Sequence, residues 1–113
     1  MGAILFLKLV AVHYLCDYPL QGDFLAKAKN HRQPIPGVPW LQALIAHAAI
    51  QAAGVWFVTG SLPLAAIEFV GHGLIDWLKC NDSISYNMDQ FLHLSFKLNF
   101  ALWLSFHFHL ENL

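Results

Sequence analysis

Charged residues are scarce in this sequence. They make up 12% of its 113 residues, whereas 58% are hydrophobic and the mean hydropathy is +0.51. A soluble domain of ordinary composition has about 25% charged residues, so this composition argues against that class. The formal net charge is only -1, and no basic stripe with interleaved aromatic residues is present. We therefore expect membrane lipids as partners and no nucleic acid.

Cysteine is equally scarce. Cys16 and Cys80 lie far apart and in no CxxC spacing, which predicts two free thiols and no disulfide. The apolar N-terminus is not followed by a small-residue cleavage site, so we predict a retained membrane helix there and no signal peptide. No repeat or low-complexity tract interrupts the sequence. We therefore predict one domain over residues 1–113.

Long hydrophobic runs dominate the rest of the sequence. They cover about residues 2–21, 40–58, 64–78 and 88–110. Because about 20 apolar residues span a bilayer, these runs predict an all-α fold, a four-helix transmembrane bundle that is multi-pass in the cell membrane. The connection after the first run contains three prolines and Gly37, which predicts an irregular segment.

The distribution of basic residues predicts the orientation of this bundle. Lys27, Lys29 and Arg32 lie in the first connection, and Lys79 begins the third. Cytoplasmic connections carry an excess of Lys and Arg, so we predict that both termini face away from the cytoplasm. Asp23, Lys27 and Lys29 are predicted to form a solvated face of the first connection.

Histidine and acidic residues recur four positions apart in the apolar runs. The pairs and triplets are His13 with Asp17, Glu68 with His72 and Asp76, and Asp89 with His93. Four residues are just over one helical turn, so each set lines one helix face. Ionisable groups in lipid are costly and rarely idle. With His47, all of these residues fall in the cytoplasmic half of the predicted bundle, which predicts one shared polar site.

The residue types at this site suit a divalent metal, with zinc as the expected ion. Imidazole nitrogen and carboxylate oxygen are typical ligands of zinc and other first-row ions. The predicted ligands are His13, Asp17, His47, His72, Asp76, Asp89 and His93. They exceed the needs of one zinc, and the surplus could bind a second metal, orient the histidines or supply a base. His31, His107 and His109 are predicted to lie outside the site, near the membrane interfaces.

Two further residues are predicted to take part in catalysis if the site is hydrolytic. Glu68 lies deepest in its stripe, where desolvation favours a general base. Lys97 lies one turn beyond His93 on the same face, where it could offset the negative charge of a phosphoryl transition state.

Three segments carry a family resemblance: HYLCDYPLQGDFLAKAK, EFVGHGLIDWLK and MDQFLHLSFK. In this order they resemble the family of small bacterial and phage membrane proteins called domain of unknown function 3307, which has the pattern His-x3-Asp-[Tyr/Phe]-x-Leu-Gln. The resemblance covers nearly the whole chain and implies an integral protein of the bacterial inner membrane, or of a host membrane if a phage encodes it. It implies polar motif positions at His13, Asp17, Gln21, His47, His72, Asp76, Lys79, Asp89, Gln90 and His93. It supplies no function.

Three classes of function fit these observations. The first is a metal-dependent hydrolase of a phosphate or acyl ester at the cytoplasmic leaflet. The HxxxD spacing is similar to ligand pairs in zinc-dependent phospholipase C and in a membrane hydrolase family, which slightly favours this class. The second is an ion, proton or metal carrier, since intramembrane carboxylates and histidines also build ion pathways. The third is a non-catalytic membrane subunit with a structural metal site. A homo-oligomer is compatible with all three.

Overall fold

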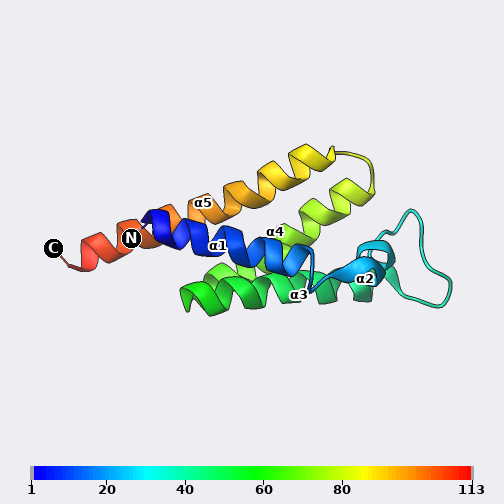
Figure 1. The fold of residues 1–113 in the computed structure, drawn as a ribbon, viewed down its shortest axis with the longest axis horizontal. Helices are drawn as coiled ribbons and strands as arrows, with labels where there is room; N and C mark the ends of the chain where they lie inside the picture. Colours follow the sequence, from blue (N-terminus) through cyan, green and yellow to red (C-terminus); the bar gives the residue numbers. More distant parts are fainter. Residues whose placement is uncertain (1, 113) are drawn as a thin grey trace.

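The computed structural model describes residues 2–112, and this part of the chain is all-α, without a strand (Figure 1). Its helices are α1 (Gly2–Asp17), α2 (Gly22–Ala28), α3 (Trp40–Thr59), α4 (Leu62–Cys80) and α5 (Tyr86–Glu111). The all-α class is confirmed. Both cysteines are free, as predicted. The number of helices within residues 2–112 is five, whereas the sequence predicted four.

The extra helix arises where the first hydrophobic run bends. The run was predicted to be helical to residue 21, but α1 ends at Asp17, and α2 departs from it at an angle of 82°. Pro19, which cannot donate a backbone hydrogen bond, lies in the break. Gly22 starts α2 with a φ of +67°, a conformation that glycine adopts without steric strain. The segment predicted to be irregular therefore begins with a short helix.

The other helices agree with the predicted runs to within a few residues. α4 and α5 each begin two residues before the predicted start, because a serine caps them. The Ser61 hydroxyl accepts a hydrogen bond from the Leu64 N–H, and the Ser85 hydroxyl accepts one from the Met88 N–H. Such capping satisfies backbone donors that the first helical turn leaves free.

The four long helices pack in a ring. α3 packs against α1 and α4, and α5 packs against the other sides of α1 and α4. Small residues allow close approach in this ring: a Cβ added at Gly54 of α3 would lie 2.5 Å from Val12 Cγ1 of α1. α2 and the connection after it extend beyond one end of the ring (Figure 1).

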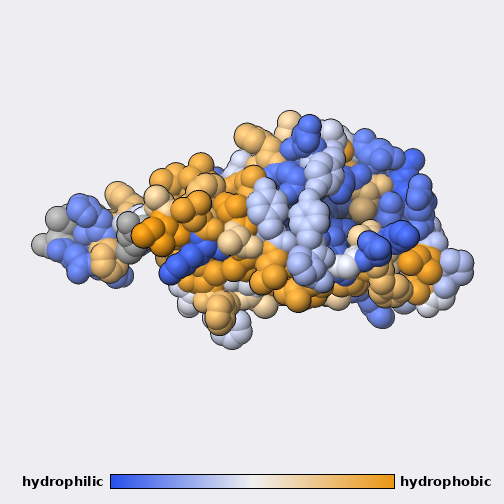
Figure 2. Space-filling view, viewed as in Figure 1, coloured by the Kyte–Doolittle hydropathy of each residue, from blue (hydrophilic) through white to orange (hydrophobic). Residues whose placement is uncertain are grey.

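Polar side chains fill one half of the interior. The buried polar and charged residues within 2–112 are His13, Lys29, His47, Gln51, Glu68, His72, Asp76, Asp89, His93 and Lys97. An apolar cluster that includes Leu9, Val55 and Phe100 fills the half away from α2. The outer surface carries large apolar side chains over much of its area, and hydrophilic residues gather towards the two ends of the molecule (Figure 2).

One helix of the described chain, α3, is long and apolar enough by itself to cross a membrane. α1 and α2 meet the same criterion only when taken together as a bent pair. α4 and α5 are long enough, but buried residues such as Glu68, Asp76 and Lys97 lower their hydropathy. A single candidate span is weaker support for membrane insertion than the four predicted spans.

Candidate metal centre

The structure brings the seven predicted ligands to one level of the bundle. Each long helix contributes the half that lies nearer α2: the end of α1, the start of α3, the end of α4 and the start of α5. The ligands on one helix are four residues apart, so they share its inner face. Asp17 is half-buried, and the other six are buried.

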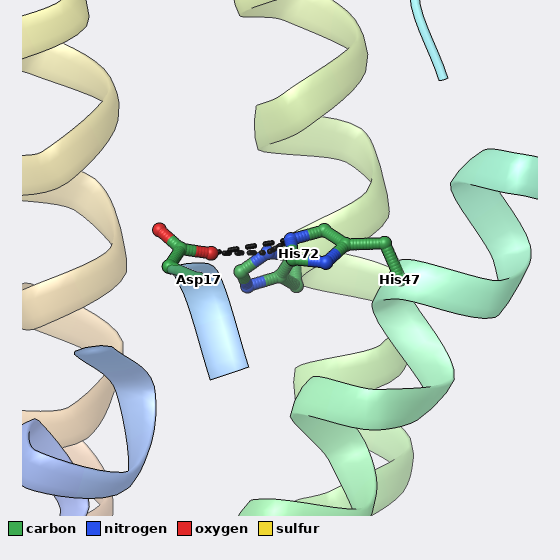
Figure 3. Close-up of side chains that lie close together, drawn as sticks. All are labelled: Asp17, His47 and His72. Carbon is green, nitrogen blue, oxygen red and sulfur yellow. Dashed lines mark hydrogen bonds and ion pairs between the residues drawn. The ribbon is translucent and has the colours of Figure 1, made fainter. Parts of the chain in front are cut away.

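Two histidines and two aspartates place ligand atoms close to one another. His47 Nε2 lies 3.1 Å from His72 Nε2 (Figure 3). Asp17 Oδ1 lies 3.1 Å from His47 Nε2 and 3.8 Å from His72 Nε2. Asp76 Oδ2 lies 3.4 Å from His47 Nε2 and 3.5 Å from His72 Nε2. Ligand atoms of a tetrahedral zinc ion with bonds of about 2.0–2.1 Å are about 3.3–3.4 Å apart. Asp17, His47 and His72, which we call the first ligand set, have spacings near these values and could hold a small divalent ion, and Asp76 lies beside them.

Glu68 lies on the other side of the His72 ring from this set. The His72 Nδ1–H donates to Glu68 Oε1 at 3.1 Å, which leaves the lone pair on Nε2, the atom that faces the first ligand set. Glu68 Oε1 also accepts a hydrogen bond from Lys97, and both side chains are buried. A carboxylate behind a ligating histidine fixes its tautomer and orientation. Glu68 and Lys97 are thus placed to position His72, and neither of them lines the cavity that borders Asp17 and Asp76.

His93 and Asp89 lie next to the first ligand set. His93 Nε2 is 3.0 Å from Asp76 Oδ1 and 3.3 Å from Asp89 Oδ1. The His93 ring stacks on the His72 ring, with centroids 4.0 Å apart and planes inclined by 24°. Asp76 therefore contacts imidazoles through both of its oxygens.

His13 and two glutamines hold Asp17. His13 Nε2 lies 3.3 Å from Gln90 Oε1 and 3.4 Å from Asp17 Oδ2. The Gln51 amide donates to Asp17 Oδ1 at 2.8 Å, and the Gln90 amide donates to Oδ2 at 3.3 Å. Gln51 was missed by the sequence analysis. Its position four residues after His47, on the same helix face, was the signal that could have found it.

Lys29 corrects a prediction. It was expected on a solvated face of the first connection, but it is buried, and its Nζ donates to Asp76 Oδ2 at 2.6 Å. The bend between α1 and α2 places α2 at the end of the ring, where Lys29 reaches Asp76 of α4. No local pattern in the sequence predicts this contact, because the contact depends on the bend.

A cavity of about 320 Å³ opens beside the centre, and Asp17, Asp76 and Asp89 are among its lining residues. Lys29 and Lys79 also line it. A second cavity of about 420 Å³ shares these two lysines and adds Arg32. Three cations and one acid line the second cavity, which therefore favours anions, whereas four aspartates and two lysines line the first.

Gln21, Tyr18 and Tyr86 line the first cavity. Gln21 donates from its amide to the Asp17 carbonyl oxygen at 2.8 Å. The hydroxyls of Tyr18, in the turn after α1, and Tyr86 share a hydrogen bond, which raises the pKa of Tyr18. The remaining histidines predicted outside the centre lie elsewhere: His31 stacks on Trp77, and His107 contacts Trp103.

Residues 4–111 match the model of the family described as Protein of unknown function (DUF3307). The chain belongs to this family. No curated protein and no solved structure shows a significant match.

In this DUF3307 chain the buried histidines and aspartates could hold a metal ion, and they form two overlapping groups within residues 2–112. One consists of Asp17, His47 and His72, and the other of His72, Asp76 and His93. The donors are nitrogen and oxygen only. This donor set suits zinc, manganese, iron and similar ions, so the identity of the ion is left open by the site.

Proposed function

We propose that this protein is a multi-pass membrane protein of the cell membrane in which the four long helices enclose a polar centre. The distribution of side chains supports this proposal, because acids, lysines and histidines lie inside while large apolar residues face outward. In membrane proteins, ionisable residues face the interior of the bundle and mark functional sites. A soluble domain has the opposite distribution.

The outer faces of α4 and α5 are also apolar, although α3 is the only helix of the described chain that meets the criterion for a membrane span by itself. Val70 and Leu74 of α4 are 67% and 58% exposed, and Leu102 and Phe106 of α5 are 59% and 62% exposed. In water these side chains would form a large apolar surface of the kind that promotes aggregation. In lipid the same surface is the favourable one. The charges that reduce the hydropathy of these helices lie on their inner faces.

We further propose that the protein is a metal-dependent hydrolase of a phosphate ester at the cytoplasmic leaflet. The observation that supports this most is the first ligand set, Asp17, His47 and His72, with spacings of 3.1–3.8 Å beside an open cavity. A divalent ion held there would supply Lewis-acid chemistry and activate water. The chain itself orients His72 through Glu68 and holds Asp17 through Gln51 and Gln90.

The excess of cations around the second cavity favours a phosphate over an acyl ester. Lys29 and Lys79 line both cavities, and Arg32 adds a planar group that binds phosphate oxygens in pairs. Lys29 also contacts Asp76, and an ammonium group retains further donors for a substrate. The cavities lie at the end of the ring that carries α2, where a lipid headgroup could enter.

A carrier function has less support. The half of the ring away from α2 is filled by an apolar cluster that includes Leu9, Val55, Leu64 and Phe100. This cluster closes the path that an ion would need to cross the bundle. A purely structural metal site would not need an open cavity beside it.

Purified protein in vesicles of phosphatidylglycerol and phosphatidylethanolamine tests the hydrolase proposal. After addition of zinc or manganese, we expect release of phosphate-containing products, measured by phosphorus NMR and mass spectrometry. His72→Ala should reduce the release to background, whereas His107→Ala, a matched histidine on the outer half of α5, should leave it unchanged. If no phosphoester is cleaved with any divalent metal, or if the two variants behave alike, the hydrolase proposal fails.

A further inference from the structure

We infer that the centre binds two metal ions bridged by Asp76, and that His93 and Asp89 hold the second ion. This inference rests on the metal centre proposed above. The first ligand set supplies three protein ligands, and catalytic sites typically leave a further position open. Asp76 lies between this set and His93, so it is placed to reach an ion on each side.

The two oxygens of Asp76 face different histidines. Oδ2 lies 3.4 Å from His47 Nε2 and 3.5 Å from His72 Nε2, on the side of the first ligand set. Oδ1 lies 3.0 Å from His93 Nε2. A carboxylate with each oxygen beside a separate imidazole is placed to bridge two ions.

Asp89 provides an independent indication of a cation. Its Oδ1 lies 3.3 Å from His93 Nε2, is buried, and has no hydrogen-bond donor within the described residues. Its Oδ2 accepts a hydrogen bond from the Gln90 amide at 3.0 Å, which fixes the carboxylate. A buried carboxylate oxygen without a donor is costly and calls for an explanation. An ion bound by Asp89 Oδ1, His93 Nε2 and Asp76 Oδ1 would satisfy it.

The spacing of the imidazoles fits a pair of ions. The His72 and His93 rings are neighbours, with centroids 4.0 Å apart, so ions bound to the two rings would lie close together, as the ions of two-metal sites do. The proposed ligands of the second ion also border the cavity of about 320 Å³, because Asp76 and Asp89 line it. His13 contacts Gln90 and Asp17, so we assign it to the support of Asp17 and not to an ion.

Metal counting on the detergent-purified chain tests this inference without an activity assay. The protein is loaded with manganese or zinc, freed of excess metal, and analysed by mass spectrometry against protein concentration from amino-acid analysis. We expect two ions per chain in the wild type and in His107→Ala. We expect one ion per chain in His93→Ala and in Asp89→Asn. Asparagine has nearly the same shape as aspartate, so Asp89→Asn should preserve the fold. Manganese-loaded wild type should also show the exchange-coupled EPR signal of a bridged pair, and both variants should lose it.

The outcomes separate this inference from the proposed function. One ion per wild-type chain, unchanged in His93→Ala and Asp89→Asn, would overturn the second ion and leave the first ligand set standing. Two ions without exchange coupling would overturn the Asp76 bridge. No bound ion in the wild type would overturn the metal centre as a whole.

Discussion

Glu68 and Lys97 form a buried ion pair between α4 and α5, and Glu68 also accepts from the His72 Nδ1–H. We expect Glu68→Gln to reduce metal affinity by about 10–100-fold, because it removes the carboxylate that orients a ligating histidine. It should also destabilise the protein by about 3–5 kcal/mol, because the Lys97 charge remains buried without its partner. Chelator competition and thermal unfolding in detergent measure the two effects.

A double variant separates positioning from base catalysis. Glu68→Gln with Lys97→Met removes both charges, and replacing a buried ion pair by neutral groups of similar volume is often tolerated. We expect stability to return while metal affinity stays reduced. If both variants bind metal like the wild type and lose only turnover, Glu68 acts as the general base that its position in the sequence suggested.

At the scale of residues, the sequence identified contacts within a helix and missed those between helices. The spacing of four along α1, α4 and α5 was enough to place His13, Asp17 and His72 on inner faces. The pairing of Glu68 with Lys97 joins residues 29 positions apart, and that of Lys29 with Asp76 joins residues 47 apart. Neither pairing follows from the period of a helix.

At the scale of elements, hydrophobic length predicted α3, α4 and α5 closely but not the bend after α1. Apolar character continues through the break, whereas the break depends on local backbone conformation around Pro19 and Gly22. The bend brings α2 and Lys29 over the end of the ring. The element that the sequence predicted least well is therefore one that completes the cavity.

Close packing of α1 against α3 predicts a specific effect of one methyl group. Gly54→Ala would place a Cβ 2.5 Å from Val12 Cγ1, and the β-branched valine has little freedom to move. Overpacking of this kind typically costs about 1–3 kcal/mol, so we expect a lower thermal stability in detergent.

Gly73→Ala on α4 is the matched control, because its Cβ would meet Ala48 Cβ at an ordinary 3.7 Å. This variant should be as stable as the wild type, or more stable by up to about 1 kcal/mol, the gain in helix propensity. Equal destabilisation by the two substitutions would show that the ring is not packed as described.

At the scale of the whole molecule, the interior is polar near α2 and the exterior is apolar, and the start of α1 and the end of α5 lie at the opposite end of the ring (Figure 1). Lys27, Arg32 and Lys79 lie on the α2 side. If the protein spans the membrane as proposed, the positive-inside rule predicts that this side faces the cytoplasm. We expect an alkaline phosphatase fusion at the C-terminus to be active and a green fluorescent protein fusion to be dark. The reverse pattern would contradict the orientation and the proposed leaflet.

X-ray absorption spectroscopy of the zinc-loaded protein tests the metal centre most directly. We predict a shell of nitrogen and oxygen only, at about 2.0–2.1 Å, with outer scattering from imidazole rings. His47→Ala should weaken the imidazole scattering, whereas His107→Ala should leave the spectrum unchanged. Sulfur scattering at about 2.3 Å, or a spectrum that does not change in His47→Ala, would contradict the account.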